Sequence, residues 1–549
     1  MLSAIARQDK VEKLDSYHFD ILIIGGGITG AGIALDARTR GLSVALIDMQ
    51  DFSAGTSSRS TKLVHGGLRY LKQFEVKMVA EVGKERAIVY ENAPHVTTPI
   101  QMLLPFYKKG TFGRTSTSIG LKVYDFLAGV KKEERRIMLS KDETLRLEPL
   151  LKEKSLLGGG LYTEYRTDDA RLTIEVMKKA DELGALCVNY VKMDNFFYHN
   201  GKVQGVQAKD LLMNKEISIQ ATHVINAAGP WVDEVRSKDS IENGKQLRLT
   251  KGVHIVLDRQ RFPLKQAIYF DAPDGRMIFA IPRGDKAYIG TTDTVYEKNP
   301  IHPIASNDDV SYLIDNLNRQ FPDHSFTFAD VESTWAGVRP LIFEEGKDPS
   351  EISRKDEVWR STSGLWSIAG GKLTGYRKMA ETIVDEVMKE FDSTKQIASG
   401  TKHLSLSGGG VNGSTGLSSF LQQKKKEGQL HGLSEEESME LASYYGSNVD
   451  HVFSFYAFLN INNTSLPRIE AAKLAYSIQY EMCMKPQDFL IRRSGYGFFH
   501  LEKAWDLLSG VTEFLGDRLH YSPEQKETLK KEAESELTLL TQFKEGKFL

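Results

Sequence analysis

Cysteine is scarce in this sequence, since its 549 residues include only Cys187 and Cys483. Two cysteines cannot build a disulfide framework, so the composition excludes a disulfide-rich secreted scaffold and favours a reducing compartment. We interpret both as small buried hydrophobic side chains.

Charge of one sign and long apolar runs are scarce as well. The formal net charge is −2, which gives no overall field for nucleic acid, so nucleic acid is not an expected partner. No apolar run approaches the ~20 residues that span a bilayer, and residues 1–18 lack the continuous apolar core of a secretory signal. We therefore expect a cytoplasmic protein, one that can still lie on the inner face of the cell membrane.

Metal-binding spacings are missing too: the chain has no H-E-x-x-H and no paired cysteines, so we expect no metal. What the chain does have is length and an ordinary globular composition, 41% hydrophobic and 26% charged. A chain of 549 residues is too long for one core, and two or three domains are expected.

Residues 19–48 read as one strand–turn–helix–strand unit. A buried-strand pattern at residues 20–24 leads into Gly25, Gly27 and Gly30, spaced as G-x-G-x-x-G, and a second strand at 43–47 leads to Asp48. Such glycines permit a tight turn, the approach of a pyrophosphate and close helix packing, while the helix N-terminus attracts an anion. Because Asp48 can accept hydrogen bonds from an adenosine ribose, the unit predicts a dinucleotide site in a Rossmann-like domain.

The loop that follows Asp48 is rich in hydroxyls and glycine, which can contact phosphate or a flat ring: Thr56, Ser57, Ser58, Ser60, Thr61, Gly66 and Gly67. A flavin is bulky and edged with acceptors, so it needs such a loop more than a nicotinamide does. The alternative interpretation is a solvated surface loop. The pattern favours FAD.

At this point the sequence resembles a known family. GGGITGAG followed by TSSRSTKLVHGGLRYL is similar to the FAD-dependent glycerol-3-phosphate dehydrogenases, among the D-amino-acid-oxidase-like flavoproteins. Six later segments resemble the same family in order: DDARL (168–172), INAAGPWVD (225–233), KGVHIV (251–256), IGTTD (289–293), AGVRPL (336–341) and AGGKLTGYRKMAE (369–381).

Two of these segments also have a physical interpretation as cofactor contacts. A strand at 222–229 ends in the small residues Ala228 and Gly229, although an ordinary strand exit would look the same. Residues 364–381 repeat the strand–glycine–helix order and supply the further candidates Gly370, Gly371, Lys372, Leu373 and Thr374, with the helix expected from Thr374 onward. Its N-terminus could face the flavin.

The domain organisation follows from composition and from the resemblance together. Short strands between 254 and 292 suggest an antiparallel sheet, residues 405–416 read as a flexible connector, and the rest reads as helices. We predict an α/β fold, with a Rossmann-like FAD-binding domain (15–95, 155–235, 350–398) interleaved with an antiparallel-sheet substrate or cap domain (96–154, 236–349). An all-helical C-terminal domain (399–549) follows.

Candidate substrate residues lie within or near the matched segments. A phosphate dianion suits arginine, and the candidates are Arg339 and Arg354, with Arg69 and Tyr70 beside the flavin loop, although a single arginine is more often a surface ion-pair partner. His65 or His254 could act as the base if its pKa is ordinary, and either could instead be a core histidine. Lys372 could neutralise charge at the flavin or touch the substrate.

The resemblance implies oxidation of sn-glycerol 3-phosphate to dihydroxyacetone phosphate, with electrons passed through FAD to a membrane quinone. The alternatives are an oxidase that uses oxygen, an amino-acid oxidase, and a flavin-binding interaction protein without turnover. The short interval from Arg339 to Gly370 favours the dehydrogenase, because the oxidase relatives are expected to carry an insertion there. A basic amphipathic stretch at 111–136 suggests membrane contact, although such helices more often pack on their own domain. A homodimer is one candidate assembly.

Overall fold

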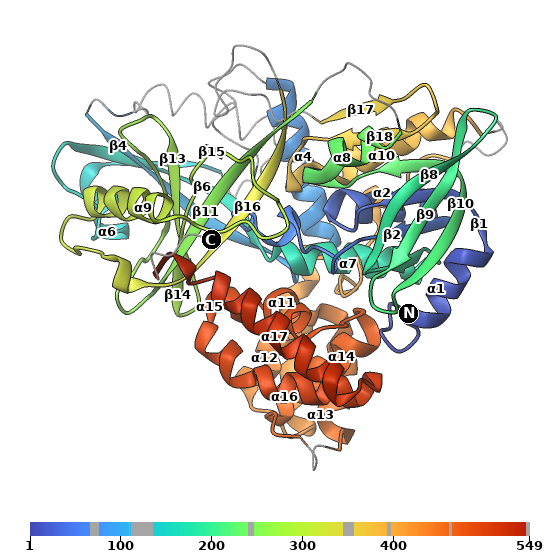
Figure 1. Cartoon of the computed structure of the whole chain (residues 1–549). Coiled ribbons are helices and arrows are strands. Elements are labelled where there is room, and N and C mark those ends of the chain that lie inside the picture. The colour runs from blue at the N-terminus through green and yellow to red at the C-terminus, as the bar shows by residue number, and fades with distance from the viewer. Residues whose placement is uncertain are drawn as a thin grey trace.

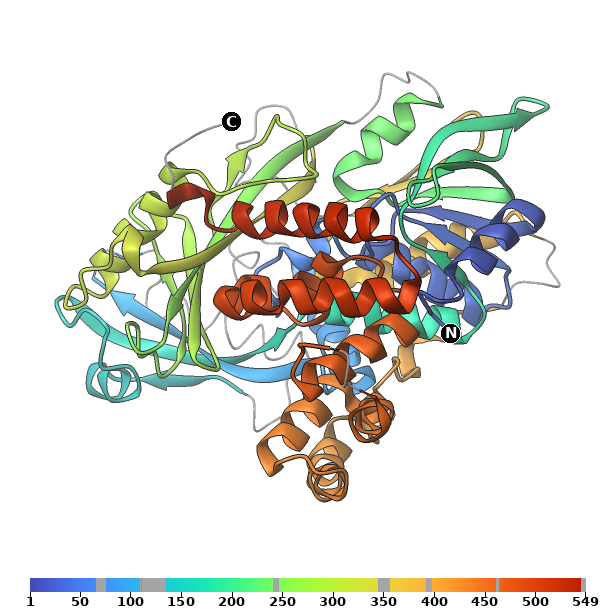
Figure 2. The same ribbon diagram turned by 60° about the horizontal axis from the view of Figure 1, so that its bottom comes forward.

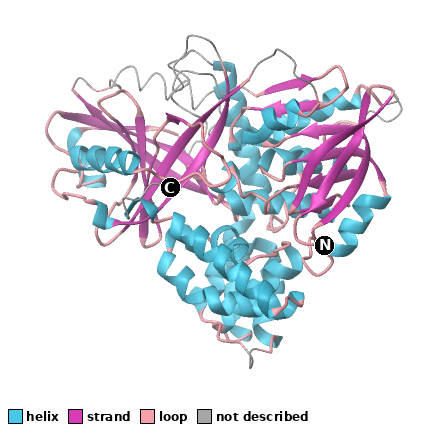
Figure 3. Ribbon diagram, viewed as in Figure 1, coloured by secondary structure: helices cyan, strands magenta, loops and turns pink. Residues whose placement is uncertain are grey.

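The computed structural model describes residues 1–65, 76–108, 110, 135–239, 246–343, 356–391, 397–460 and 464–544. Two sheet regions lie side by side, and a group of helices from the C-terminal third of the chain packs below both of them (Figure 1). In Figure 3 the strands lie in the two sheet regions together with helices, and the region below them is helical.

The first sheet is mainly parallel and has helices packed against it. Its main path runs β17 (Glu357–Arg360), β18 (Trp366–Ala369), β10 (Lys215–Asn226), β1 (His18–Ile24), β2 (Val44–Ile47) and β7 (Leu186–Val188), with β8 (Val191–His199) and β9 (Lys202–Asp210) joined antiparallel to β10. The apolar runs of β1 and β2 are buried, as a parallel sheet covered by helices requires. Helix α2 (Ile28–Thr39) packs between α7 (Asp169–Glu182) and α10 (Tyr376–Met388).

The second sheet is mainly antiparallel. Its path runs β15 (Thr294–Val295), β11 (Leu247–Asp258), β14 (Lys286–Gly290), β13 (Met277–Arg283), β12 (Ala267–Asp271), β4 (Thr97–Tyr107), β6 (Leu156–Thr167) and β3 (Leu63–Val64); β16 (Val331–Ile342) pairs with β11, and β5 (Ile137–Leu139) with β6. The only parallel neighbours on this path are β4 and β12, among the described strands. Helix α9 (Asn307–Gln320) packs on this sheet, whose core forms a hydrophobic cluster of its own.

The remaining helices of the first two regions are α1 (Arg7–Ser16), α4 (Val76–Asn92), α6 (Lys141–Leu147) and α8 (Val232–Ser237). The C-terminal region contains α11 (Gly413–Leu430), α12 (Glu435–Tyr445), α13 (Val449–Phe458), α14 (Arg468–Tyr480), α15 (Tyr496–Phe499), α16 (Leu501–Leu519) and α17 (Pro523–Leu539). A π-helical turn, Asp488–Arg493, lies between α14 and α15. Figure 2 shows α16 and α17 lying across the junction of the two sheet regions.

The predicted fold class is confirmed: a Rossmann-like α/β region, an interleaved antiparallel sheet and a helical C-terminal region. The domain boundaries stay a prediction. One predicted boundary differs from the observed strand pairing. We assigned β6 to the FAD-binding domain, but β6 pairs with β4 and so extends the second sheet. The second sheet therefore continues to Thr167, beyond the predicted boundary at 155.

The glycine-rich segment 405–416 does not have the flexible structure that its composition predicts. Leu406 and Val411 are buried, and a Cβ added to Gly409 would lie 2.2 Å from the carbonyl oxygen of Asn92. The glycines here serve close packing against α4. The basic amphipathic stretch at 111–136 lies outside the described residues, except for its last two.

Within the described part of the chain, no helix is both long enough and apolar enough to cross a membrane.

Candidate functional site

The glycine turn after β1 depends on the absence of side chains. Gly25 has φ +113°, and a Cβ there would lie 2.5 Å from the carbonyl oxygen of Ala227. A Cβ on Gly30 would lie 1.9 Å from the carbonyl oxygen of Gly25, so Gly30 allows α2 to pack against the turn. Gly27 leaves the helix N-terminus open, and the hydroxyl of Ser57 accepts a hydrogen bond from the Ile28 N–H at 3.0 Å.

Asp48 stands at the end of β2 and contacts the same turn. Its Oδ2 accepts a hydrogen bond from the Gly26 N–H at 2.6 Å, and its Oδ1 accepts one from the Gln50 N–H at 2.7 Å. Burial raises the pKa of Asp48 to about 7, although these two N–H donors oppose the shift. The carboxylate is therefore fixed in place beside the glycine turn, where it can accept ribose hydroxyls.

A cavity of about 360 Å³ is lined by residues of both sheets. The predicted site residues that line it are Gly25, Gly27, Asp48, Thr56, Ser57, Ser60, Thr61, His65, Ala228, Gly229, His254, Arg339, Gly370, Gly371, Lys372, Leu373 and Thr374. Ser58 and Gly30 do not line it: Ser58 is buried, and Gly30 is a buried residue of α2. Gly66, Gly67, Arg69, Tyr70 and Arg354 lie outside the described residues. Each residue's role stays a prediction.

The second glycine turn, at Gly370 and Gly371, lines this cavity together with the hydroxyl-rich loop that follows Asp48. Gly370 and Gly371 have φ of +84° and +74°, which favour glycine. A 3₁₀ turn, Leu373–Gly375, separates them from α10, so the helix begins later than at the Thr374 we predicted. The Thr374 hydroxyl accepts a hydrogen bond from the His65 N–H at 3.1 Å, which ties this turn to the hydroxyl-rich loop.

His254 lies on β11 opposite Trp335 of β16 and Gly290 of β14. Its imidazole stacks on the indole of Trp335, and its Nε2 lies 3.1 Å from the hydroxyl of Thr61. Burial, together with the charges of Arg339 and Lys62, lowers the pKa of His254 well below its ordinary value. The ordinary pKa assumed from the sequence is therefore wrong for this histidine, which is neutral at physiological pH.

Arg339 is oriented by two residues that the sequence did not single out. Its Nη1 donates to Asp293 Oδ1 at 3.1 Å, and its Nη2 donates to the Thr291 hydroxyl at 3.0 Å. Gly252 makes room for the guanidinium, since a Cβ there would lie 2.1 Å from Nη2. All three belong to the matched segments KGVHIV and IGTTD, but only the fold shows that these segments meet.

These features fit FAD. A glycine turn at a helix N-terminus suits a pyrophosphate, and Asp48 suits a ribose. The hydroxyl of Ser53, which lines the cavity, is buried without a hydrogen-bond partner among the described residues, as expected of a group that awaits a ligand. Gly25, Gly27, Asp48 and the two later glycines would hold the cofactor.

Comparison with known proteins also indicates an FAD-binding protein. A family model described as FAD dependent oxidoreductase matches residues 20–376, and one described as the C-terminal domain of alpha-glycerophosphate oxidase matches residues 399–526. The aerobic glycerol-3-phosphate dehydrogenase of Staphylococcus aureus is 56% identical over 538 residues, which are 97% of each chain.

Among solved structures, the glycerol-3-phosphate dehydrogenase from Bacillus halodurans, complexed with FAD, matches with a TM-score of 0.86 and 44% identity, covering 98% of this chain and 99% of that one. The L-alpha-glycerophosphate oxidase from Mycoplasma pneumoniae, with FAD bound, matches with a TM-score of 0.56 and 16% identity, covering 68% and 96%, and shows the shared fold alone. The predicted resemblance and the predicted FAD cofactor are confirmed, and the chain belongs to the family of FAD-dependent oxidoreductases.

Proposed function

We propose that this enzyme oxidises sn-glycerol 3-phosphate to dihydroxyacetone phosphate. The observation that carries the proposal is the 56% identity, along 97% of both chains, to a protein named aerobic glycerol-3-phosphate dehydrogenase. The solved structure with a TM-score of 0.86 is that of a glycerol-3-phosphate dehydrogenase. A likeness along 97% of the chain includes the second sheet, where the candidate substrate residue Arg339 lies on β16.

The cavity has the groups that this reaction needs. When bound, FAD supplies the redox chemistry by accepting the two electrons of the secondary alcohol. Arg339 presents a planar cation that can hold two oxygens of the substrate phosphate, and Asp293 keeps it oriented. His254 is neutral and can accept a proton from the hydroxyl, although its low pKa makes it a weaker base than an ordinary histidine. His65 lines the same cavity and is the second candidate.

For the electron acceptor we propose a membrane quinone. The basic amphipathic stretch at 111–136 supports contact with an anionic membrane, which a lipid-soluble acceptor requires. The short interval between Arg339 and Gly370 supports a dehydrogenase. We accordingly propose a cytoplasmic protein, peripheral on the inner face of the cell membrane, with a homodimer as the candidate assembly.

A second candidate is the oxidase, which would pass electrons to oxygen. The observation that favours it is the C-terminal family model, which is named after an alpha-glycerophosphate oxidase. Turnover of glycerol 3-phosphate with a quinone analogue and with air-saturated buffer, under otherwise identical conditions, decides between the two. We expect fast quinone reduction and slow peroxide formation. Peroxide output that matches the quinone rate would make the enzyme an oxidase.

A further inference from the structure

Two arginines of the C-terminal region bind one aspartate beside the FAD site. Arg493 donates from both terminal nitrogens to the carboxylate of Asp51, at 2.5 and 2.8 Å. Arg492 donates from Nε to Asp51 Oδ2 at 2.6 Å. The side-chain amide of Asn189 also donates to Asp51 Oδ1, at 3.0 Å. Asp51 and Arg493 are fully buried, and the Arg492 side chain is 6% exposed.

The arginines are themselves held rigidly. Both belong to the π-helical turn Asp488–Arg493, a conformation that is rare and is often found at functional sites. Arg492 also donates to Asp488 at 2.6 Å, while Arg493 donates to the carbonyl oxygen of Glu481 at 2.8 Å. Although burial raises the pKa of Asp51, the charges of Arg493 and Arg492 hold it below its ordinary value, so Asp51 stays ionised.

Asp51 lies at the start of the loop that wraps the glycine turn. The Ser53 N–H donates to the carbonyl oxygen of Gly26 at 3.0 Å, and the Ala54 N–H donates to that of Asp51 at 3.1 Å. Gln50, on the other side of Asp51, donates to Asp48. The cavity-lining residues of this loop are Gln50, Ser53, Ala54, Gly55, Thr56 and Ser57. Fixing Asp51 therefore fixes one wall of the FAD cavity.

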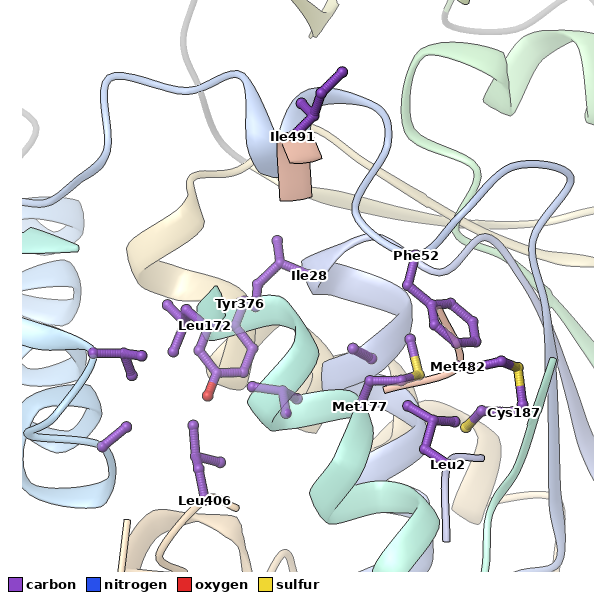
Figure 4. Packing of buried hydrophobic residues seen from close by; sticks show 14 of the residues in the cluster. Leu2, Ile28, Phe52, Leu172, Met177, Cys187, Tyr376, Leu406, Met482 and Ile491 are labelled. Carbon is purple, nitrogen blue, oxygen red and sulfur yellow. The ribbon is translucent and has the colours of Figure 1, made fainter. Parts of the chain in front are cut away.

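Apolar packing joins the same two regions. Phe52 is fully buried and packs on the glycine turn, since a Cβ on Gly26 would lie 2.7 Å from its ring. Phe52 shares one hydrophobic cluster with Met482 and Ile491 of the C-terminal region, and Figure 4 shows the side chains of Phe52 and Met482 next to each other. The loop is thus held by charge at Asp51 and by packing at Phe52.

We propose that the C-terminal region is part of the FAD-binding machinery: Arg492 and Arg493 hold the loop 50–57 through Asp51 and thereby control how tightly FAD is retained. They are positioning residues, since they act through Asp51. The inference depends on the FAD-dependent family and not on the proposed substrate.

The test uses the full-length holoenzyme and the FAD dissociation constant measured by equilibrium dialysis. Arg493→Lys and Arg492→Lys keep the charge but lose the planar fork. Because a small displacement of a positioning loop is costly, we expect each to raise the FAD dissociation constant by about tenfold or more. In an Asp51→Asn background, Arg492→Lys should add less than about twofold, because the two residues act through one contact.

The matched control is Arg40→Lys. Arg40 is also buried and binds two carboxylates, Asp36 at 2.7 Å and Asp385 at 2.6 Å, but these belong to helices α2 and α10 and neither lines the cavity. We expect this control to lower the melting temperature and to change the FAD dissociation constant by less than about twofold. The inference is overturned if Arg492→Lys and Arg493→Lys both retain FAD as tightly as the parent, or if Arg40→Lys weakens FAD binding equally. If Arg493→Lys does not fold, Arg492→Lys carries the test.

Discussion

The imidazole of His254 lies flat against the indole of Trp335, with 4.8 Å between the ring centroids and 10° between the planes. The two residues are cross-strand partners on β11 and β16. Trp335 also contacts Phe498 and Phe499 of the C-terminal region, and its indole N–H donates to the carbonyl oxygen of Ser60 at 3.1 Å. The position of His254 is thus set by a side chain that is itself fixed on several sides.

Replacing Trp335 by Leu should therefore lower turnover of glycerol 3-phosphate by about tenfold or more, because a displaced proton acceptor loses alignment with the substrate. Trp335→Phe keeps an aromatic surface and should lose less. Steady-state kinetics at saturating FAD measures both. Turnover of the Leu variant at the level of the parent would show that the stack has no role in positioning.

Arg339→Ala should weaken glycerol 3-phosphate binding by about 2–5 kcal/mol, as expected when one partner of a desolvated charge pair is lost. Glycerol, which has no phosphate, should be affected little. We expect the same pattern for Arg354→Ala. Substrate titrations of each variant with both compounds provide the measurement, and equal losses for the two compounds would show that the phosphate site is assigned wrongly.

Gly30→Ala should abolish FAD binding or folding, because the new Cβ would lie 1.9 Å from the carbonyl oxygen of Gly25. A bulky side chain at Gly27 should block the pyrophosphate. Gly375→Ala is the matched control: it lies in the other glycine-rich turn, and its Cβ would meet nothing within 4 Å. FAD content of the purified variants distinguishes them. A Gly30→Ala protein with full FAD content would contradict the packing we describe.

FAD binding should strengthen as pH rises through about 7. Burial raises the pKa of Asp48 in the absence of ligand, and only the ionised carboxylate can accept hydrogen bonds from both ribose hydroxyls. Proton release therefore accompanies binding, and the FAD dissociation constant should fall between pH 6 and pH 8, on either side of about 7. Asp48→Asn should bind FAD more weakly and remove this dependence. An unchanged pH profile in Asp48→Asn would assign the titration to another group.

The sequence predicted those parts of the fold that depend on local pattern. Gly25, Gly27 and Gly30 take the turn and helix start that their spacing requires, and the strand pattern at 254–292 forms β11 to β14. The glycines of 405–416 misled us because glycine serves close packing as well as flexibility, and composition does not distinguish the two.

Contacts between segments that are distant in the chain could not be predicted from the sequence. The low pKa of His254 results from burial and from Arg339 and Lys62, which only the folded sheets bring near. The Arg493 contact with Asp51 joins residues 442 positions apart. Asp51, Arg492 and Arg493 fit no sequence motif of cofactor binding. An aspartate and an arginine far apart in the sequence give no indication that they form an ion pair in the fold.

The most direct test of the account is anaerobic mixing of the purified holoenzyme with glycerol 3-phosphate while the visible flavin absorbance is recorded. We predict rapid bleaching, with one dihydroxyacetone phosphate formed for each flavin, and no bleaching with glycerol at the same concentration. An oxidised flavin spectrum that persists in the presence of saturating glycerol 3-phosphate would contradict the proposed activity.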